Sequence, residues 1–539
     1  MKSKLSVLTA LVLLLTSVPV LGGQKVGPGV EPDTTVYFTI QNYFLSPFQL
    51  SDYNFLGGGA RARGMGGAFL GVSDDASAAS WNPAGLSQVD KPQMNLSFSS
   101  LMRRTESTST LESSNPQQSF GDKLKYDNNS ISFASVALPF KIRDRQLVGG
   151  VFFQRLADIY QEGKYHFMLD SVVYLDTTIH NYVLPALDDR QTGNLNLVNV
   201  AVGGTVFKSL SLGVGVDIYA GSFSSNTSFF YTLDPTGLNG YKFHPHIKSD
   251  YSGFGLSFGA MYKWNRLRLG GVVKPSFTLK EENDVKLFTD IIESGILLED
   301  ASMLASPFFK TDREWKMPTM VGLGGSYQID LLTVSADLEF RNYSKTEVTY
   351  RRNIADPSGA EVTTGGYMVD QWWGKAGNYP PFVPSLGWRN LTQFRIGAEY
   401  LINTKYAKVP IRVGFRNDPQ LYTTKLDSNQ VYLRTDMYIS GTDTVYNPAF
   451  IQSNHGVEKG SWVNGRIFSF GTGLAWTQVK LDVTLEIARY DDVNKQTSTG
   501  RTAFDRGNRK LLRALEQETF SEVEKNRFSR IIVSFTGFF

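Results

Sequence analysis

The stretch that decides the fold is GGGARARGMGGAFLGVSDDASAASWNPAGL, residues Gly57–Leu86. It is rich in glycine and alanine and lacks the alternation of apolar and polar residues that is typical of a strand. Apolar anchors are nevertheless spread through it, among them Met65, Phe69 and Trp81. Because glycine allows tight turns and close approach of backbone to backbone, we expect a compact segment packed against a larger structure. A disordered linker is the alternative, although linkers usually lack such anchors.

The chain begins with the features of a secretory signal peptide. Lys2 and Lys4 precede the largely apolar run Leu5–Leu15, and the small residues at Val20-x-Gly22 form a cleavage pattern. We expect cleavage after Gly22, which assigns residues 1–22 to the signal peptide. The sequence contains no cysteine, and this excludes a lipoprotein anchor, a disulfide framework and thiolate metal sites.

Composition favours one large β domain. The 539 residues carry a formal charge of +3, and loss of Lys2 and Lys4 with the signal peptide leaves about +1. This balance gives no basic footprint for nucleic acid. No later segment reaches the roughly 18 consecutive apolar residues that a membrane helix needs. The mature sequence also has no charge-rich or proline-rich linker that would divide it into domains.

The end of the chain, RFSRIIVSFTGFF (527–539), predicts a lipid-facing strand. Ile531, Val533 and Phe535 fall on one face, while Arg530 and Ser534 fall on the other. Period-two alternation with an apolar outer row is what such a strand requires. A terminal phenylalanine also resembles the C-terminal signal of bacterial outer-membrane barrels. Similar segments recur at 93–101, 130–140, 146–156, 193–208, 211–223, 249–264, 267–280, 316–327, 330–344, 391–401, 408–416, 465–477 and 479–490.

The connections between these segments indicate a barrel. Six short turns alternate with seven long polar loops, at 102–129, 157–192, 224–248, 281–315, 345–390, 417–464 and 491–526. Only a closed sheet satisfies its backbone hydrogen bonds in lipid, and short turns opposite long loops are the asymmetry of outer-membrane barrels. We therefore predict a transmembrane antiparallel β-barrel of about fourteen strands. Aromatic residues near strand ends fit the girdles at the membrane interfaces; they include Trp264, Tyr343, Tyr400, Trp476 and Tyr490.

The run GARARGMGGAF, followed by DDA and then WNPAGL, resembles the N-terminal region of the FadL family of outer-membrane transporters for long-chain fatty acids and other hydrophobic molecules. The resemblance covers about thirty residues. It implies a hatch folded inside a fourteen-stranded barrel, so we assign residues 23–92 to the hatch and 93–539 to the barrel. Trp81 and Gly85 fit diverse relatives better than the founding fatty-acid transporter, and the long outer loops look unrelated.

Hatch residues with a proposed gating role follow from the same motifs. Asp74 and Asp75 match the DDA element and are able to cap turns or short helices through their side-chain oxygens. The family's NPA element corresponds to Asn82, Pro83 and Ala84, with Gly85 after it. Pro83 fixes one torsion angle and favours an extended Asn82. We expect this region to shift when cargo passes.

Charged side chains are expected on the inward faces of the later strands. If the apolar rows face lipid, four arginines point into the lumen, namely Arg341, Arg395, Arg412 and Arg416. Acidic residues on adjacent strands allow charge-assisted pairs, which predicts a salt-bridge network that holds wall and hatch together. The functional alternative is that one of these arginines receives an anionic head group, for which a guanidinium fork is suited.

The sequence after the seventh strand predicts a helix. In NDVKLFTDIIESGILLEDASML, Val285, Phe288 and Ile292 recur at helical spacing after a cap at Asn283 or Asp284. Its apolar stripe fits a landing groove for a hydrophobic ligand, with Phe288 and Ile292 as contacts, or a helix packed on neighbouring loops. In the family, the corresponding outer loop contributes to first capture of substrate.

Signatures of catalysis are weak. Ser257 lies in GLSFG, which matches the serine hydrolase motif GxSxG, but strand-like sequence continues through it where the motif needs a strand-to-helix turn. His244 and His246 flank Pro245, have no adjacent carboxylate, and are read as part of a solvated loop. No complete phosphate-binding loop is present. We therefore expect neither an enzyme nor a bound cofactor or metal.

The sequence as a whole predicts a passive outer-membrane channel of a Gram-negative bacterium. Its expected partners are outer-membrane lipid and a hydrophobic small molecule or fatty acid, with no nucleic acid, and a monomer is expected. Exit through the wall is a family property, and Gly149–Gly150 is a candidate kink for such an opening. One alternative is an interaction role in a secretion system, as in the FadL-like PorV proteins. A lipid-acting barrel enzyme that uses Ser257 is another.

Overall fold

The structure is a computed structural model that describes residues 39–40, 55–111, 118–174, 177–232, 240–293, 296–298, 309–346, 348–355, 361–365, 389–423, 430–440, 443–453, 462–505 and 510–539. The predicted signal peptide lies outside these ranges. So do residues 23–38 and 41–54 of the predicted hatch.

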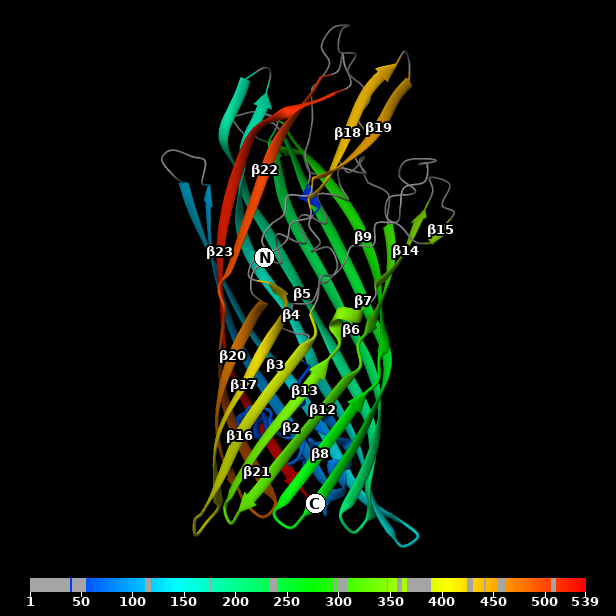
Figure 1. Cartoon of the computed structure of the whole chain (residues 1–539), viewed down its shortest axis with the longest axis vertical. Coiled ribbons are helices and arrows are strands. Elements are labelled where there is room, and N and C mark those ends of the chain that lie inside the picture. The colour runs from blue at the N-terminus through cyan, green and yellow to red at the C-terminus, as the bar shows by residue number, and fades with distance from the viewer. Residues whose placement is uncertain are drawn as a thin grey trace.

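The main sheet is a closed antiparallel barrel of fourteen strands (Figure 1). Some strands are interrupted and consist of two elements. In chain order the strands are β2 (Gln93–Leu111), β3 (Gln118–Ile142), β4 (Arg145–Tyr174), β5 (Thr177–Phe207), β6 (Leu210–Thr232), β7 (Gly240–Trp264), β8 with β9 (Leu267–Lys274, Phe277–Glu293), β11 with β12 (Phe309–Met317, Met320–Ile329), β13 with β14 (Leu332–Arg341, Val348–Ala355), β16 (Leu391–Asn403), β17 (Lys408–Thr423), β20 (Trp462–Ala475), β21 with β22 (Val479–Tyr490, Val493–Asp505) and β23 (Lys510–Phe538). Pairing of β23 with β2 closes the barrel.

The remaining strands lie near the end of the barrel that is uppermost in Figure 1. They are β10 (Ile296–Leu298), β15 (Glu361–Gly365), β18 (Gln430–Ser440) and β19 (Asp443–Ser453). The short strand β1 (Thr39–Ile40) pairs with β18 and so joins the β18–β19 hairpin. A 3-10 turn, η5 (Tyr343–Lys345), follows β13. Among the described residues, no helix is both long and apolar enough to cross a membrane.

Strand alternation follows the predicted pattern. Along β13, Leu338 is 51% exposed on the outer face, whereas Asp337 and Glu339 are buried on the inner face. The same alternation of buried and exposed residues runs through β16 and β21. An apolar outer row and a polar inner row are what a barrel wall in lipid requires.

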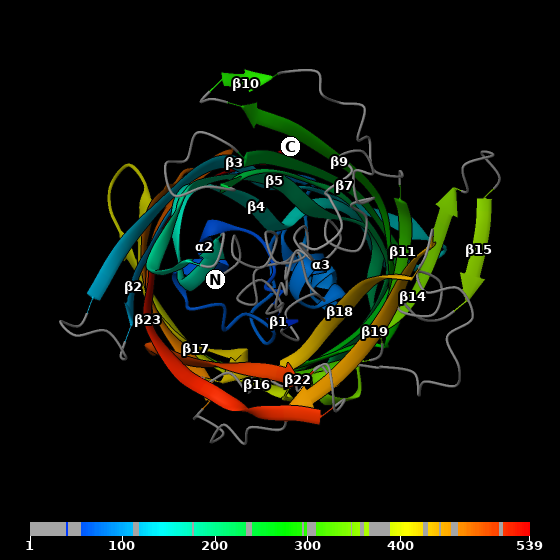
Figure 2. The same ribbon diagram turned by 90° about the horizontal axis from the view of Figure 1, so that it is seen from above.

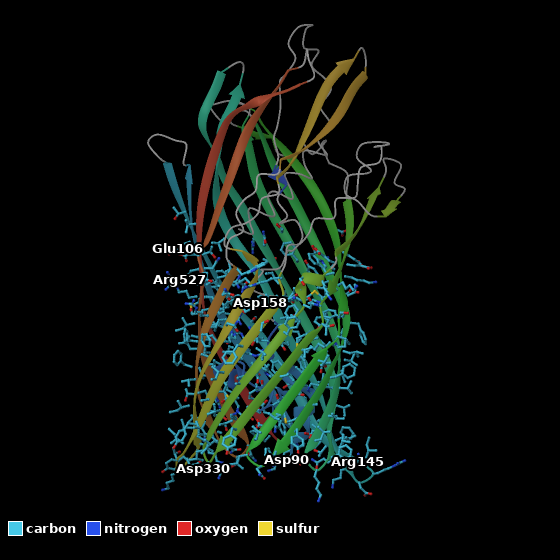
Figure 3. All side chains as sticks on the ribbon, viewed as in Figure 1. Asp90, Glu106, Arg145, Asp158, Asp330 and Arg527 are labelled. Carbon is cyan, nitrogen blue, oxygen red and sulfur yellow. The ribbon has the colours of Figure 1, made fainter. Side chains whose placement is uncertain are left out.

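Charged residues border the apolar outer surface at two levels. Asp90, Arg145 and Asp330 lie near the lower end of the barrel, while Glu106 and Arg527 lie well above them (Figure 3). Three predicted girdle residues, Trp264, Tyr400 and Trp476, are exposed. The prediction is wrong for Tyr343 and Tyr490, which are buried because the first packs into the luminal apolar cluster from η5 and the second faces inward on β21.

Tight turns connect the strands at the lower end, as the sequence predicts. Arg143, Asn265 and Asp330 each adopt a positive φ, near 50°, in three of these turns. Such a φ is rare outside turns, and two-residue hairpin connections need it.

Many strands extend far beyond their predicted ends. β5 has 31 residues, whereas about ten are enough to cross a membrane. Much of what the sequence assigns to long loops therefore continues the wall above the apolar surface. The helix predicted around Phe288 and Ile292 is wrong, because both residues lie in β9 and pair with β7. His244 and His246 also lie in a strand, β7, and not in a loop.

Residues 55–90, here called the luminal segment, lie within the ring of strands when the barrel is viewed from above (Figure 2). They contain α2 (Ala60–Gly64), α3 (Ala78–Trp81) and the 3-10 helix η3 (Pro83–Gln88). Most of these residues are buried. The compact packing expected of the glycine-rich stretch is therefore present in the structure.

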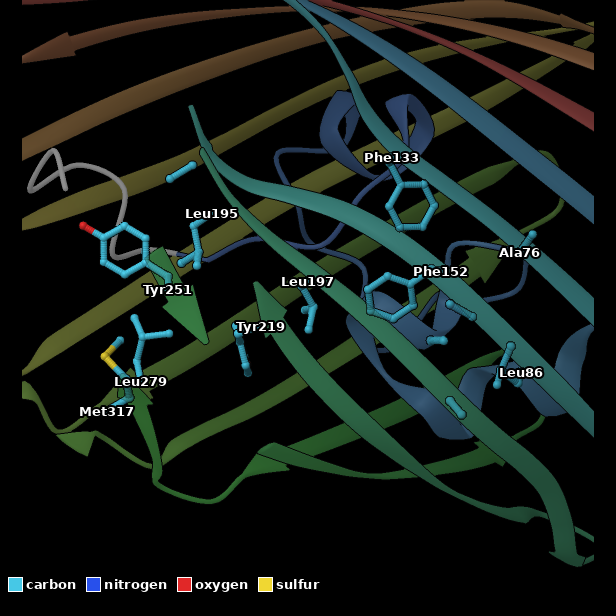
Figure 4. Packing of buried hydrophobic residues seen from close by; sticks show 14 of the residues in the cluster. Ala76, Leu86, Phe133, Phe152, Leu195, Leu197, Tyr219, Tyr251, Leu279 and Met317 are labelled. Carbon is cyan, nitrogen blue, oxygen red and sulfur yellow. The ribbon is translucent and has the colours of Figure 1, made fainter. Parts of the chain in front are cut away.

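An apolar cluster fills the space between the luminal segment and strands β3 to β7 (Figure 4). Phe133 and Phe152 pack with ring centroids 5.7 Å apart, and Leu86 of η3 belongs to the same cluster. The candidate kink at Gly149–Gly150 is not a break in the sheet, since pairing with β3 and β5 runs through both glycines. A Cβ at Gly150 would lie 3.1 Å from Leu86, so this glycine makes room for η3.

Candidate functional site

Two arginines of α2 attach the luminal segment to the wall. Arg61 Nε and Nη2 donate to the two carboxylate oxygens of Glu399 on β16, at 3.0 and 2.9 Å. Arg63 makes the same two-point contact with Glu486 on β21, with both distances 3.0 Å. Paired charge-assisted hydrogen bonds are stronger and more directional than single ones. They fix the position of α2 relative to two separate strands.

The four arginines predicted to face the lumen are all buried there. Arg341 and Arg395 share one acid, Glu339, at 2.6 and 2.7 Å. Arg395 is also opposite Asp337 in the pairing of β13 with β16. Neighbouring strands thus supply both signs of charge, as the alternation predicts.

The other two arginines extend the same network. Arg412 Nε lies 2.6 Å from Glu399, and its Nη1 lies 2.8 Å from Asp482. Arg416 lies 2.6 Å from Glu486. Glu399 therefore binds one arginine of the wall and one of α2, and Glu486 binds Arg63 of α2 together with Arg416 and, at 3.8 Å, Arg530 of the wall. This is the arrangement expected of a network that holds wall and luminal segment together, while the role of an arginine as a head-group receptor stays a prediction.

Wall side chains also satisfy backbone groups of the luminal segment. The Asp337 carboxylate accepts hydrogen bonds from the backbone N–H groups of Phe69 and Leu70, at 2.7 and 3.0 Å. Ala60 donates to the Ser534 hydroxyl, and its carbonyl accepts from Thr484. Buried backbone groups need such partners. The inner face of the barrel is thus matched to an irregular backbone.

The two acids of the DDA element both contact Arg61 but otherwise have different partners. Asp74 lies between Arg61 and Arg268 of β8, which it contacts at 3.3 Å. Burial raises the pKa of the Asp74 carboxyl, but Arg61 and Arg268 outweigh burial and hold that pKa below its ordinary value. Asp75 accepts hydrogen bonds from the backbone N–H and hydroxyl of Ser77 at 2.9 and 2.6 Å. Only Asp75 therefore makes the predicted turn-capping contact.

Asn82 connects three parts of the structure. Its Oδ1 accepts from Ala84 N–H at 3.1 Å and caps η3. Its Nδ2 donates to the carbonyls of Leu70, at 3.2 Å, and of Ala260 on β7, at 3.0 Å. Asn82 is fully buried, so these bonds replace contacts with water. The NPA element is therefore a junction between η3, the rest of the luminal segment and the wall.

Glycines of the wall allow this junction to approach closely. A Cβ at Gly213 of β6 would lie 2.3 Å from the carbonyl carbon of Pro83, and one at Gly259 of β7 would lie 2.2 Å from Asn82 Oδ1. A Cβ at Gly85 would likewise lie 2.3 Å from the carbonyl oxygen of Ser73. Any side chain at these positions would displace backbone. Of the proposed gating residues, Asn82, Pro83 and Ala84 are thus packed against wall glycines, and Gly85 is packed against Ser73.

A small cavity lies against the luminal segment on the side of Phe55 and Leu56. Its volume is about 30 Å³, roughly the space of one water molecule. Tyr219 and Phe277 stack in its wall with ring centroids 4.3 Å apart. Arg341 Nη2 donates to the Phe55 carbonyl at 2.8 Å, so the start of the luminal segment covers this space.

Of the cavity residues, sequence reasoning selected Arg341 but missed several others. Lys274 and Tyr219 line it, and Asp217 lies behind Lys274. The alternation of inward and outward residues along β8 would have indicated that Lys274 faces the lumen, because Lys274 is on the same face of this strand as the buried Val272. Ser257 is buried in the middle of β7, which confirms the reading of GLSFG as a strand with an inward serine.

Comparison with known proteins identifies a shared architecture. The sequence model of a family described as BamG matches residues 185–377, less than half of the chain. The sequence matches none of the curated proteins with which it was compared.

Two solved structures have the same fold. A crystal structure of a FadL homologue from Pseudomonas aeruginosa is 14% identical, with a TM-score of 0.51, and the match covers 90% of this chain and 98% of the homologue. The toluene transporter TodX from P. putida is also 14% identical, with a TM-score of 0.50 and coverage of 90% and 99%. The chain therefore has the fold of these FadL- and TodX-type barrels over nearly its whole length.

Proposed function

We propose that this protein is a passive channel of the outer membrane of a Gram-negative bacterium, and that it takes up hydrophobic molecules. The fold it shares with a toluene transporter and a FadL homologue supports this function. The apolar outer surface of the barrel suits lipid. In this proposal the luminal segment is a hatch that closes the lumen and moves to let cargo pass.

The observation that carries the proposal is the way in which the lumen is closed. The luminal segment is attached to the wall by side-chain contacts and close packing, with no covalent link other than the chain itself. It also borders a cavity with aromatic residues in its wall. A closure of this kind suits a channel that opens by local rearrangement and needs no energy source.

The proposal is tested by fixing the luminal segment in place. Because the chain has no cysteine, the variant R63C/E486C carries two thiols that face each other across the wall contact. Bridging them with a short, cleavable, thiol-reactive reagent is expected to stop uptake of a radiolabelled alkane or alkanol by proteoliposomes. Cleavage of the bridge should restore uptake, and single-cysteine variants serve as controls. Uptake that is unaffected by bridging would refute a moving hatch.

Absence of uptake in the unmodified protein, for fatty acids and for aromatic hydrocarbons alike, would refute the channel itself. The barrel would then have to serve another purpose.

A second candidate, an outer-membrane interaction component, is supported by one observation. The wall formed by β4 to β7 continues far beyond the length that crosses a membrane, and thus offers a large surface outside the lipid. Copurification with partner proteins that persists in the bridged R63C/E486C variant would favour this role over transport.

A further inference from the structure

The cavity beside Phe55 and Leu56 has two cations in its wall, and each has an acid at its side. Arg341 lies 2.6 Å from Glu339. Lys274 Nζ lies 3.8 Å from Asp217 Oδ2. The local charge is therefore balanced before any ligand arrives.

The two pairs differ in hydrogen bonding. Arg341 donates to Glu339 and to the Phe55 carbonyl. The distance of 3.8 Å between Lys274 and Asp217 is too long for a hydrogen bond. Lys274 thus neutralises the Asp217 carboxylate without donating to it.

Acceptors next to Lys274 are left without donors. Asn199 Nδ2 donates to Asp217 Oδ1 at 2.6 Å, but Asp217 Oδ2 and Asn199 Oδ1 have no hydrogen-bond partner in the part of the chain that the structure describes. The same holds for the Ser257 hydroxyl. All three side chains are at most 1% exposed. Buried polar groups are normally satisfied, so the two acceptors Asp217 Oδ2 and Asn199 Oδ1 each lack a donor in this arrangement.

A glycine keeps the space between the two strands open. Asp217 is on β6 and Lys274 on β8, and Gly255 of the intervening strand β7 pairs with Asp217. Because Gly255 has no side chain, Lys274 reaches across β7 toward the carboxylate. Asp217 does not itself line the cavity, so a small group that contacts both Nζ and Oδ2 must push part of the Lys274 side chain aside.

We propose that the cavity binds the polar end of a neutral amphipathic molecule, an alcohol or phenol, between Lys274 and Asp217. A hydroxyl donates one hydrogen bond and accepts another, so it supplies the donor that Asp217 Oδ2 lacks and accepts from Lys274 Nζ. The apolar part of the ligand lies along the stacked rings of Tyr219 and Phe277. Since the cavity is small, this part displaces Phe55 or Leu56.

A carboxylate is a poorer ligand for the same place. It brings a second negative charge beside Asp217 and has no proton to give to either orphaned acceptor. Buried like charges disfavour each other strongly. The inference rests on the proposed uptake of hydrophobic molecules, and it specifies the head group that such a molecule carries.

The test compares three probes of equal chain length, dodecanol, dodecanoate and dodecane, in competition with a fluorescent alkanol for the protein in lipid nanodiscs. Wild type is expected to prefer dodecanol over dodecanoate by about tenfold, the factor that one hydrogen bond is worth. D217N keeps the shape of the side chain but frees the charge of Lys274, so the preference should reverse toward dodecanoate. In D217N/K274M the two probes should bind equally.

The control is D330N, which removes an acid from an exposed turn where its side chain is 81% exposed, and which should retain the wild-type preference. Resistance of each barrel to unfolding in SDS shows that it is folded. Equal or tighter binding of dodecanoate by wild type, or an unchanged preference in D217N, would overturn the neutral head group while leaving hydrophobic uptake in place. If none of the three probes binds, the proposed function itself fails. Binding of all three with equal affinity means that water satisfies the cluster, and the inference is wrong.

Discussion

The luminal segment meets the barrel wall in two contrasting ways. On one side α2 faces β16 and β21, where Arg61 and Arg63 form two-point contacts with buried acids. On the other side η3 faces β6 and β7, where Asn82 and Pro83 lie directly against wall glycines. We refer to these as the charged side and the glycine side.

The difference concerns what each contact tolerates. A buried ion pair depends on the presence of both partners, because a single charge left in a low-dielectric interior is very unfavourable. Close packing of backbone on a glycine requires that this position has no side chain, so any added side chain disturbs it. Close packing on glycine also occurs beside α2, since a Cβ at Gly414 of β17 would lie 2.0 Å from Gly66 N and one at Gly397 of β16 would lie 2.2 Å from the Met65 carbonyl oxygen. The two sides differ because the charged side adds the two-point ion pairs of Arg61 and Arg63 to this packing. Four substitutions test this contrast.

The largest effect is expected from E486Q on the charged side. Glu486 contacts Arg63 and Arg416, and it is fully buried. Its neutralisation removes the acid that Arg63, Arg416 and Arg530 share. The buried Arg63 guanidinium loses its counter-charge, which destabilises a structure by about 3–5 kcal/mol. Denaturant unfolding measures the loss, and planar-bilayer recording should show more frequent opening. D330N, on an exposed turn, is the control; equal stability of the two variants would contradict the network.

A smaller but still severe effect is expected from G213A on the glycine side. The added Cβ would lie 2.3 Å from the Pro83 carbonyl carbon and 2.4 Å from Ala84 N, so η3 must move, at a cost of about 1–3 kcal/mol. Protease sensitivity of residues 55–90 in the folded barrel measures the displacement. G271A is the matched control, because its Cβ would meet nothing closer than 3.5 Å. If residues 55–90 resist the protease equally well in G213A and G271A, close packing on Gly213 does not position the luminal segment.

N82A tests the junction without adding atoms. It removes the cap of η3 and the bonds to Leu70 and Ala260, and we expect a loss of about 1–2 kcal/mol, as for other buried caps. Hydrogen exchange should increase at Ala84 while the contacts of Arg61 and Arg63 persist. Exchange that rises equally over α2 would show that the two sides are one cooperative unit, and the contrast would fail.

D74N is expected to have the smallest effect, below about 1 kcal/mol, because this ion pair is partly exposed. The folded state lowers the pKa of Asp74, so its contribution is complete above the ordinary aspartate value and is lost as pH falls through the lowered pKa. Wild-type stability should therefore be independent of this group between pH 5 and about 8. Measured unfolding curves of wild type and D74N should converge only in acid. Equal stability of wild type and D74N near neutral pH would show that the Asp74 carboxylate does not stabilise the fold, and would contradict this prediction.

Much of the fold is predictable because a lipid-facing wall imposes a strict pattern. The outer row ending in Phe535 and the inward arginines, such as Arg395, follow from parity alone. Parity is lost where the wall leaves the apolar region, since both faces then tolerate polar residues, and the strand ends there could not be predicted. Spacing misled at Phe288 and Ile292, because residues four apart share a face in a strand as well as in a helix. Lys274 and Asp217 were missed because their proximity depends on pairing across an intervening strand.

The contact between Ala60 and the final strands has a consequence for biogenesis. Ala60 donates to Ser534 and accepts from Thr484, residues that are synthesised more than 400 positions later. The contacts of the charged side therefore cannot be complete until β23, the last strand, has been made. The glycine side needs only β5 to β7, which exist much earlier. The luminal segment, which is translated before every strand of the barrel, is thus secured in two stages, and its final attachment needs the same strand that seals the cylinder.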